Sequence, residues 1–142
     1  MTLHLIKLAA GADGVDELKR RIAASLAANR KSGRGEIHVH ETRMFPRRRN
    51  EILAGGSLYW VIKGVVLYRQ KILDLETRTG SDGVERCGIA LDPGLVATQA
   101  QPRRAFQGWR YLAAEDAPPD LSSGQASAPP ALRAKLAELG LL

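Results

Sequence analysis

Hydrophobic and polar positions alternate with two different periods over the first third of the chain. Residues 3–8 place Leu or Ile on both faces of an extended segment, which predicts a short, largely buried strand. From Val15, apolar residues recur every three or four positions as far as Leu26. This spacing predicts an amphipathic helix that is capped by Asp13 or Asp16 and ends at the Ser/Gly-rich residues 32–35.

The next segments predict a second strand and a short helix. Residues 36–42 alternate, with Ile37 and Val39 on one face and polar groups on the other, which indicates a half-exposed strand. In residues 43–56, Pro46 can occupy the first position of a short helix, and Gly55-Gly56 can supply its C-terminal cap.

Residues 57–77 form the most β-like region of the chain. The run is too long for one flat strand, so Gly64 is expected to mark a bulge, bend or turn. Asp82-Gly83 then predicts a hairpin turn onto a strand at 84–91, and shorter strands are expected at 95–98 and 106–112.

These elements predict a single α+β domain over residues 1–120. It should contain a curved, mostly antiparallel sheet or a small β-barrel, with the N-terminal helix packed on it. Residues 121–142 are rich in Ser, Gly, Ala and Pro, and then place Leu132, Leu136 and Leu139 at helical spacing. We expect a flexible linker that ends in a short C-terminal helix.

Composition narrows the class of protein. The chain has 142 residues, 44% hydrophobic and 25% charged, as in an ordinary soluble protein. Its one cysteine, Cys87, leaves no disulfide partner within the chain and fits a reducing compartment. The longest uncharged run typical of a core, 52–62, is shorter than a membrane span, and residues 1–7 lack the pattern of a signal peptide. We therefore expect a cytoplasmic protein with no membrane association.

The net charge of +6 is unevenly distributed. Residues 43–111 carry 12 basic and 6 acidic side chains and all seven aromatic residues. Basic groups neutralise phosphates and aromatic rings stack on bases, so their overlap favours nucleic-acid binding. In the alternative interpretation, the aromatic residues form the core and the arginines only confer solubility.

Two groups of arginines could bind phosphates if the fold brings them together. One lies at residues 43–49 and the other at 103–110. The predicted phosphate partners are Arg43, Arg47, Arg48, Lys63, Arg69, Arg103, Arg104 and Arg110, and the predicted stacking groups are Tyr59, Trp60 and Trp109. Trp109 can equally belong to a small core.

Two registers are open around Gly64. Without a bulge, Arg69 and Lys71 share a face with Tyr59, and Trp60 lies opposite. A bulge would instead place Tyr59 and Lys63 beside Tyr68 and Gln70, on a mixed basic and aromatic face.

Signals for catalysis or metal binding are weak. Glu36, His38 and His40 share one strand face, but a polar face needs no metal, so neither a metal nor a cofactor is expected. Cys87 is typical of a core cysteine, and Ser57 lacks the pattern around a catalytic serine.

Several motifs together resemble a known family. They are Thr42-Arg43-Met44, Pro46-Arg47-Arg48, residues 55–64, 69–73 and 91–93, Pro102-Arg103-Arg104 and residues 106–112. The chain up to Leu121 resembles the uncharacterised alphaproteobacterial family called domain of unknown function 1489, which implies a bacterial, cytoplasmic, single-domain protein and no particular activity. The order of elements is also similar to that of PUA-like domains, many of which bind RNA or modified bases.

The leading hypothesis is therefore an RNA- or nucleotide-binding module with a basic, aromatic sheet surface. One alternative is a small enzyme that acts on a polar or nucleotide-like substrate near Gly64 and residues 108–109. Another is a protein–protein adaptor whose terminal helix docks into a partner. The oligomeric state is left open.

Overall fold

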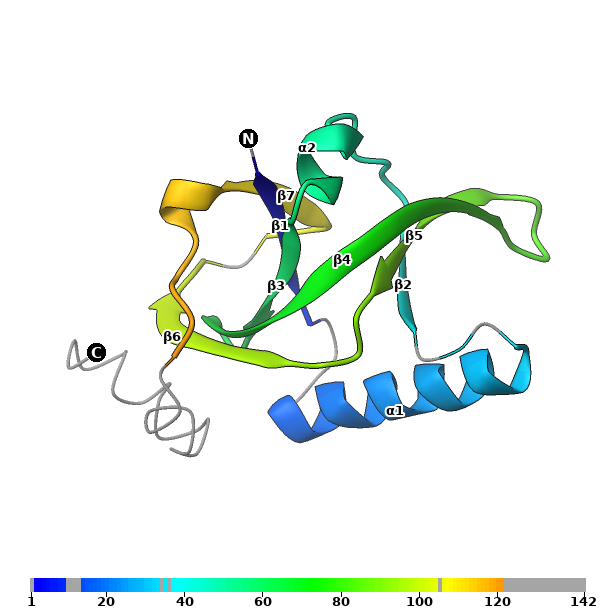
Figure 1. Cartoon of the computed structure of the whole chain (residues 1–142), viewed down its shortest axis with the longest axis horizontal. Coiled ribbons are helices and arrows are strands. Elements are labelled where there is room, and N and C mark those ends of the chain that lie inside the picture. The colour runs from blue at the N-terminus through cyan, green and yellow to red at the C-terminus, as the bar shows by residue number, and fades with distance from the viewer. Residues whose placement is uncertain (1, 10–13, 34, 36, 105, 122–142) are drawn as a thin grey trace.

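A curved sheet with one long helix across its end forms the protein (Figure 1). The computed structural model describes residues 2–9, 14–33, 35, 37–104 and 106–121, so the expected linker and C-terminal helix lie outside the described residues. The elements in chain order are β1 (Leu3–Leu8), α1 (Val15–Lys31), β2 (His38–Thr42), α2 (Arg49–Leu53), β3 (Ser57–Ile62), β4 (Val65–Thr79), β5 (Glu85–Leu91), β6 (Val96–Pro102), β7 (Trp109–Ala113) and a 3₁₀ turn, η1 (Ala114–Asp116). None of the helices in the described part is long and apolar enough to cross a membrane.

The sheet is mixed but mostly antiparallel. Its strand order is β2-β5-β4-β3-β1-β7, and β6 also pairs with β4. Only the β1–β3 pair among these is parallel. The α+β expectation is therefore confirmed.

The small-barrel alternative is wrong, because the sheet is not closed: β2 and β7 stand at the two ends of the strand order. The chain leaves β2 after Thr42, before a ladder to β7 could form. A side-chain bond links the two ends instead, with the Trp109 indole N–H donating to the carbonyl of Met44 at 2.8 Å. We call the gap between β2 and the β1–β7 pair the seam.

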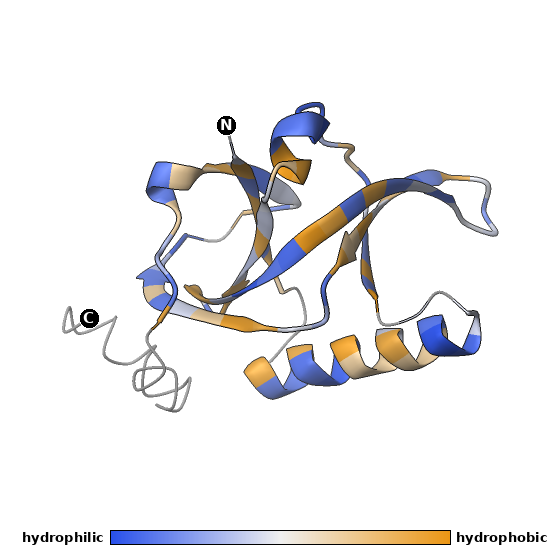
Figure 2. Ribbon diagram, viewed as in Figure 1, coloured by the Kyte–Doolittle hydropathy of each residue, from blue (hydrophilic) through white to orange (hydrophobic). Residues whose placement is uncertain are grey.

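Strand β4 gives the sheet its curvature. Its first part pairs with β3 and β6, and its second part pairs with β5. Register shifts at Val66/Tyr68 and Ile72/Asp74 bend the strand between these partners. Figure 2 shows the hydrophobic and hydrophilic bands that alternate along it.

Gly64 forms a hairpin turn. Lys63 and Gly64 have φ of 50° and 81°, and Ile62 pairs with Val65 across the turn. Positive φ at both central residues is the pattern of a type I′ turn. The resulting register places Tyr59 opposite Arg69 and Trp60 opposite Tyr68, so the mixed face of Tyr59 with Tyr68 does not form.

Two apolar clusters lie on the two faces of the β7-β1-β3-β4 part of the sheet. The larger contains Leu5, Trp60 and Trp109 and packs against α1 through Leu18 and Ile22. The smaller consists of Ile6, Tyr59, Val61, Val66 and Leu112. The apolar stripe predicted from Val15 is thus the buried face of α1, and the predicted helix is confirmed. Its N-cap is Gly14, without a side-chain cap bond, so the cap at Asp16 is wrong, and Asp13 lies outside the described residues.

The helix before Gly55-Gly56 is shorter than predicted. It spans Arg49–Leu53 rather than beginning at Pro46. Gly56 donates its backbone N–H to the Ile52 carbonyl at 2.8 Å. A Cβ at Gly56 would lie 2.3 Å from the Leu3 carbonyl oxygen, so the close approach of this turn to β1 requires glycine.

Candidate functional site

Strand β7 holds the first arginine group against the edge of the sheet. Among the strands that the structure describes, β7 pairs with β1 alone. The Tyr111 hydroxyl accepts hydrogen bonds from the backbone N–H groups of Arg47, at 2.9 Å, and Arg48, at 3.3 Å. Together with the Trp109–Met44 bond, these contacts fix residues 43–48 on one side of β7.

Arg110 extends the positive charge to the other side of this strand. Its guanidinium lies 5.5 Å from the centre of the Phe106 ring and donates to the backbone carbonyls of Gln107 and Trp109. Residues 47 and 48 thus lie beside Tyr111 and Arg110 lies on the other side of the same edge strand, whereas Arg49 pairs with Asp74 of β4 at 2.6 Å.

Most of these charges are not balanced by a carboxylate. Arg43 and Arg47 are exposed and make no ion pair with a residue that the structure describes. Arg48 lies 5.7 Å over the Tyr111 ring but is bonded to Glu51 through Nε, at 3.0 Å, and Nη2. This hydrogen bond raises the pKa of Arg48 and lowers that of Glu51.

Apolar side chains stand between the arginines. Met44, Phe45 and Tyr111 are 61%, 43% and 37% exposed, unusually high values for large hydrophobic residues. We call this cluster the β7 edge surface; it comprises Arg43, Met44, Phe45, Arg47, Arg48, Arg110 and Tyr111. Sequence analysis did not select Phe45 or Tyr111 for stacking, although both directly flank the arginine groups.

The three predicted stacking residues lie in the core. Tyr59, Trp60 and Trp109 are no more than 5% exposed, and both indole N–H groups have partners inside the protein. They occupy the positions of core aromatic side chains, the alternative considered for Trp109.

Lys63, Arg103 and Arg104 form a second basic group at the β3–β4 turn. The Arg103 backbone N–H donates to the Gly64 carbonyl at 2.8 Å, which brings the end of β6 beside Lys63. The Arg103 side chain bonds only to Gln101 in the described part of the chain.

Arg69 lies in a different environment from the other predicted phosphate partners. It forms a bidentate pair with Asp120, at 2.8 and 2.7 Å, and donates to Ser57 Oγ at 2.9 Å. The bond to Asp120 raises the pKa of Arg69 and lowers that of Asp120. Arg69 therefore fastens residues 118–121 to the sheet.

A cavity of about 400 Å³ lies beside this pair and includes His4, Ser57 and Tyr59 in its lining. His4 Nδ1 accepts the backbone N–H of Ser57 at 3.0 Å, so it is not a base for the Ser57 hydroxyl. Burial, and then the charge of Arg69, lower the pKa of His4. Ser57 is therefore not activated as a nucleophile by His4.

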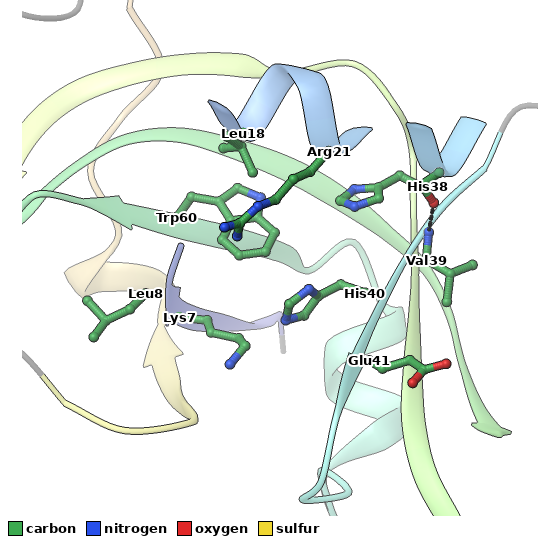
Figure 3. Close-up of a pocket in the computed structure, with 10 residues that line it drawn as sticks. Lys7, Leu8, Leu18, Arg21, His38, Val39, His40, Glu41 and Trp60 are labelled. Atoms are coloured by element: carbon green, nitrogen blue, oxygen red, sulfur yellow. Dashed lines mark hydrogen bonds between the residues drawn. The ribbon is translucent and has the colours of Figure 1, made fainter. Parts of the chain in front are cut away.

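A second cavity, of about 250 Å³, opens at the seam (Figure 3). We call it the seam pocket. Its walls come from β1, α1, β2 and β3, and it is lined by Lys7, Leu8, Leu18, Arg21, Ser25, His38, Val39, His40, Glu41 and Trp60.

The polar face of β2 forms one wall of this pocket. His38, His40 and Thr42 pair with Leu91, Ile89 and Cys87 of β5, which are fully buried. The alternation of β2 was predicted correctly, but its polar face turns inward.

Gln70 satisfies the buried polar groups behind the pocket. Its Oε1 accepts from Trp60 Nε1 at 2.9 Å and lies 3.1 Å from His38 Nδ1, while its Nε2 donates to the Asp92 carbonyl at 3.0 Å. An amide oxygen cannot donate, so His38 must carry its proton on Nδ1. Burial lowers the pKa of His38, which favours the neutral ring.

His40 is the unusual group of the pocket. Its ring meets Trp60 edge-on at 5.1 Å, and its Nε2 is buried without a hydrogen-bond partner among the described residues. Burial first, and then the charge of Lys7, lower the pKa of His40 to about 3, with smaller effects from His38 and Arg21. The ring is therefore neutral at physiological pH.

The described residues offer little other reactive chemistry. Burial raises the pKa of the Cys87 thiol to about 11, so it is a core cysteine with little thiolate character. No three His, Cys, Asp or Glu side chains within the described ranges are grouped to hold a metal ion, and Glu36 lies outside those ranges.

The fold and these surfaces define a small α+β protein with an open curved sheet, a basic edge and a histidine-lined pocket. The chain belongs to the DUF1489 family of proteins of unknown function, whose model matches residues 5–142. The family prediction is thus confirmed, and the match continues beyond Leu121. Neither a curated protein nor a solved structure matches the chain, so the likeness to PUA-like domains has no support from these comparisons.

Proposed function

We propose that this protein is an RNA- or nucleotide-binding module and that the β7 edge surface is its binding face. One observation carries the proposal: exposed guanidiniums and exposed aromatic rings occupy the same open sheet edge. Guanidiniums contact phosphates, and the faces of Phe45 and Tyr111 can stack on unpaired bases.

The arrangement of charge supports this function over simple solubility. Solubilising charges are normally interspersed with acids, whereas Arg43 and Arg47 have no carboxylate partner among the residues described. Backbone bonds to Tyr111 also fix where residues 47 and 48 lie. A fixed row of cations beside exposed rings suits single-stranded nucleic acid.

Binding to a labelled single-stranded RNA, measured by fluorescence anisotropy over a range of salt concentrations, tests the proposal. Each lost phosphate contact should reduce the slope of log K against log salt by about 0.7. The double variant Arg43→Ala/Arg47→Ala should therefore bind at least about tenfold more weakly, with a slope smaller by about 1.4.

The matched control is Arg20→Ala/Lys19→Ala on the exposed face of α1, which removes the same charge elsewhere. The control should retain near wild-type binding. Equal losses in the two double variants, or RNA binding that does not depend on salt, would contradict the proposal.

The expected cytoplasmic location and bacterial source accompany this proposal as predictions. A small molecule that copurifies with the protein and is identified by mass spectrometry would instead favour the small-enzyme alternative. The adaptor alternative depends on the terminal helix, which lies outside the described residues.

A further inference from the structure

The seam pocket is a separate site with an excess of positive charge. Figure 3 shows Lys7 from β1, Arg21 from α1 and His40 from β2 directed toward one shared space. Lys7 is half-buried, and it makes no ion pair with any residue that the structure describes. Burial lowers its pKa, as expected for a cation without a counter-charge.

The nearby carboxylates do not neutralise this charge. The closest Glu17 oxygen to Arg21 is 3.7 Å away, and Glu17 is held by Arg20 at 2.6 Å. Glu41, the acid in the lining, pairs with Arg78 at 3.3 Å, and Figure 3 shows it pointing away from the other polar groups. Neither carboxylate pairs with Lys7, and Arg21 is paired only at 3.7 Å, so the pocket keeps an excess of positive charge.

We propose that the seam pocket binds the phosphate of a compact organic phosphate, either a free nucleoside monophosphate or the phosphorylated end of an RNA strand. A phosphate monoester carries a charge of about −1.5 to −2 at neutral pH, which matches Lys7 and Arg21. A carboxylate carries a single charge and would match only one of these two cations.

The other walls fit the remainder of such a ligand. Leu8, Leu18 and Trp60 provide apolar surface on which a sugar or base can rest. A volume of about 250 Å³ lies just below the usual range for small-molecule pockets, so the ligand must be compact. Buried His40 Nε2, which has no partner, supplies a hydrogen-bonding group for the ligand.

Anion binding should also change the pKa of His40. The charged or titratable groups that line the pocket are Lys7 on β1, Arg21 on α1, and His38 and Glu41 beside His40 on β2. Burial is the largest cause of the low pKa of His40, and an anion between Lys7 and Arg21 offsets only the smaller effect of these two cations, so it raises this pKa while burial still favours the neutral ring.

Calorimetric titration of the full chain with adenosine monophosphate and with inorganic phosphate tests this site. Arg21→Gln and Lys7→Gln should each weaken binding of the nucleotide at least about tenfold. Lys19→Gln, two positions away on the exposed face of α1 and without an ion pair to a described residue, is the matched control and should bind within about twofold of wild type. The His40 imidazole nitrogen signals should shift on titration, because the ligand contacts Nε2.

Absence of saturable binding of either probe at millimolar concentration would overturn the proposal. So would losses as large in Lys19→Gln as in Arg21→Gln. Thermal unfolding of each variant, with a midpoint near that of wild type, ensures that a loss of binding is not a loss of folding.

RNAs of one sequence, with a 5′-phosphate or a 5′-hydroxyl, distinguish the two sources. A preference for the phosphorylated end that disappears in Arg21→Gln identifies a strand end. If adenosine monophosphate binds tightly but the two RNAs bind equally well, the ligand of the pocket is a free nucleotide. The strand-end version rests on the proposed function, but the nucleotide titration does not. RNA binding that survives the Arg43→Ala/Arg47→Ala change would contradict the proposed function and leave the pocket result intact.

Discussion

At the scale of single residues, Gln70 shows how a buried amide can organise a pocket from behind. Its side chain is fully buried and joins Trp60, His38 and the carbonyl of Asp92. Its position in a predicted strand gives no sign of this, because its partners lie 10, 32 and 22 positions away.

Replacement of Gln70 should destabilise the protein more than its size suggests. Gln70→Leu leaves the N–H groups of Trp60 and His38 and the carbonyl of Asp92 without partners. The Trp60 and His38 N–H groups are buried, and each unsatisfied buried group costs roughly 1–3 kcal/mol, so we expect a loss of about 2 kcal/mol or more in urea unfolding. Gln99→Leu, at an exposed strand position, is the control and should change stability by less than about 0.5 kcal/mol. A Gln70→Leu variant as stable as this control would show that the network contributes little.

The candidate site could be predicted only in part at this scale. The arginines at 43 and 47 are exposed, as their density in the sequence suggested. The aromatic residues available for stacking were harder to predict. Alternation along a strand assigns side chains to two faces of the sheet, but it does not show which face is buried in the core. For the same reason, the inward direction of His38 and His40 could not be predicted.

At the scale of elements, the turn of the β3–β4 hairpin requires a backbone conformation that its first central residue, Lys63, adopts only with strain. Lys63 is the one non-glycine residue with positive φ in the described part of the chain. A lysine in this conformation is strained, whereas glycine and asparagine tolerate it.

Relief of this strain should stabilise the protein. We expect Lys63→Asn to raise the free energy of unfolding by about 0.5–1 kcal/mol, because type I′ turns favour asparagine at this position. Gly64→Ala should have the opposite effect and cost about 1–2 kcal/mol. Chemical denaturation measures both. A loss of stability in Lys63→Asn would mean that the lysine side chain makes a compensating contribution.

Elements with strong local patterns were predicted well. The apolar spacing from Val15 identified α1, and Asp82-Gly83 identified the turn before β5. The short helix before Gly55-Gly56 was predicted, but its start at Arg49 and the positions of the bends in β4 were not, because they depend on which strands and backbone groups pack beside them.

At the scale of the whole molecule, how closely the two ends of the open sheet approach each other depends on contacts that no local sequence pattern predicts. The bond that spans the seam joins Trp109 to Met44, 65 positions away. Sequence analysis could therefore predict a curved, mostly antiparallel sheet but could not decide between an open sheet and a barrel.

A second long-range contact fastens the last described segment. Gln99 donates to the Pro119 carbonyl and Leu121 to the Ala97 carbonyl, at 2.9 and 3.0 Å, while Arg69 holds Asp120. Asp120→Asn should speed amide hydrogen exchange of Gln99 and Leu121 by about two- to fivefold, since a partly exposed pair contributes up to about 1 kcal/mol. Asp116→Asn, an exposed acid on η1, should leave both amides unchanged. Equal protection in both variants would show that the backbone bonds alone hold this segment.

The open edge of β7 has a consequence for solution behaviour. A strand that pairs on one side offers backbone groups to which another chain can add, and charged side chains are a common protection against such aggregation. Arg110, whose guanidinium covers the carbonyls of Gln107 and Trp109, stands at this edge with Arg43 and Arg47. The positive charges of these side chains repel those of a second molecule and so oppose edge-to-edge pairing of the two sheets. A polyanion that neutralises them therefore also removes the barrier to edge-to-edge association.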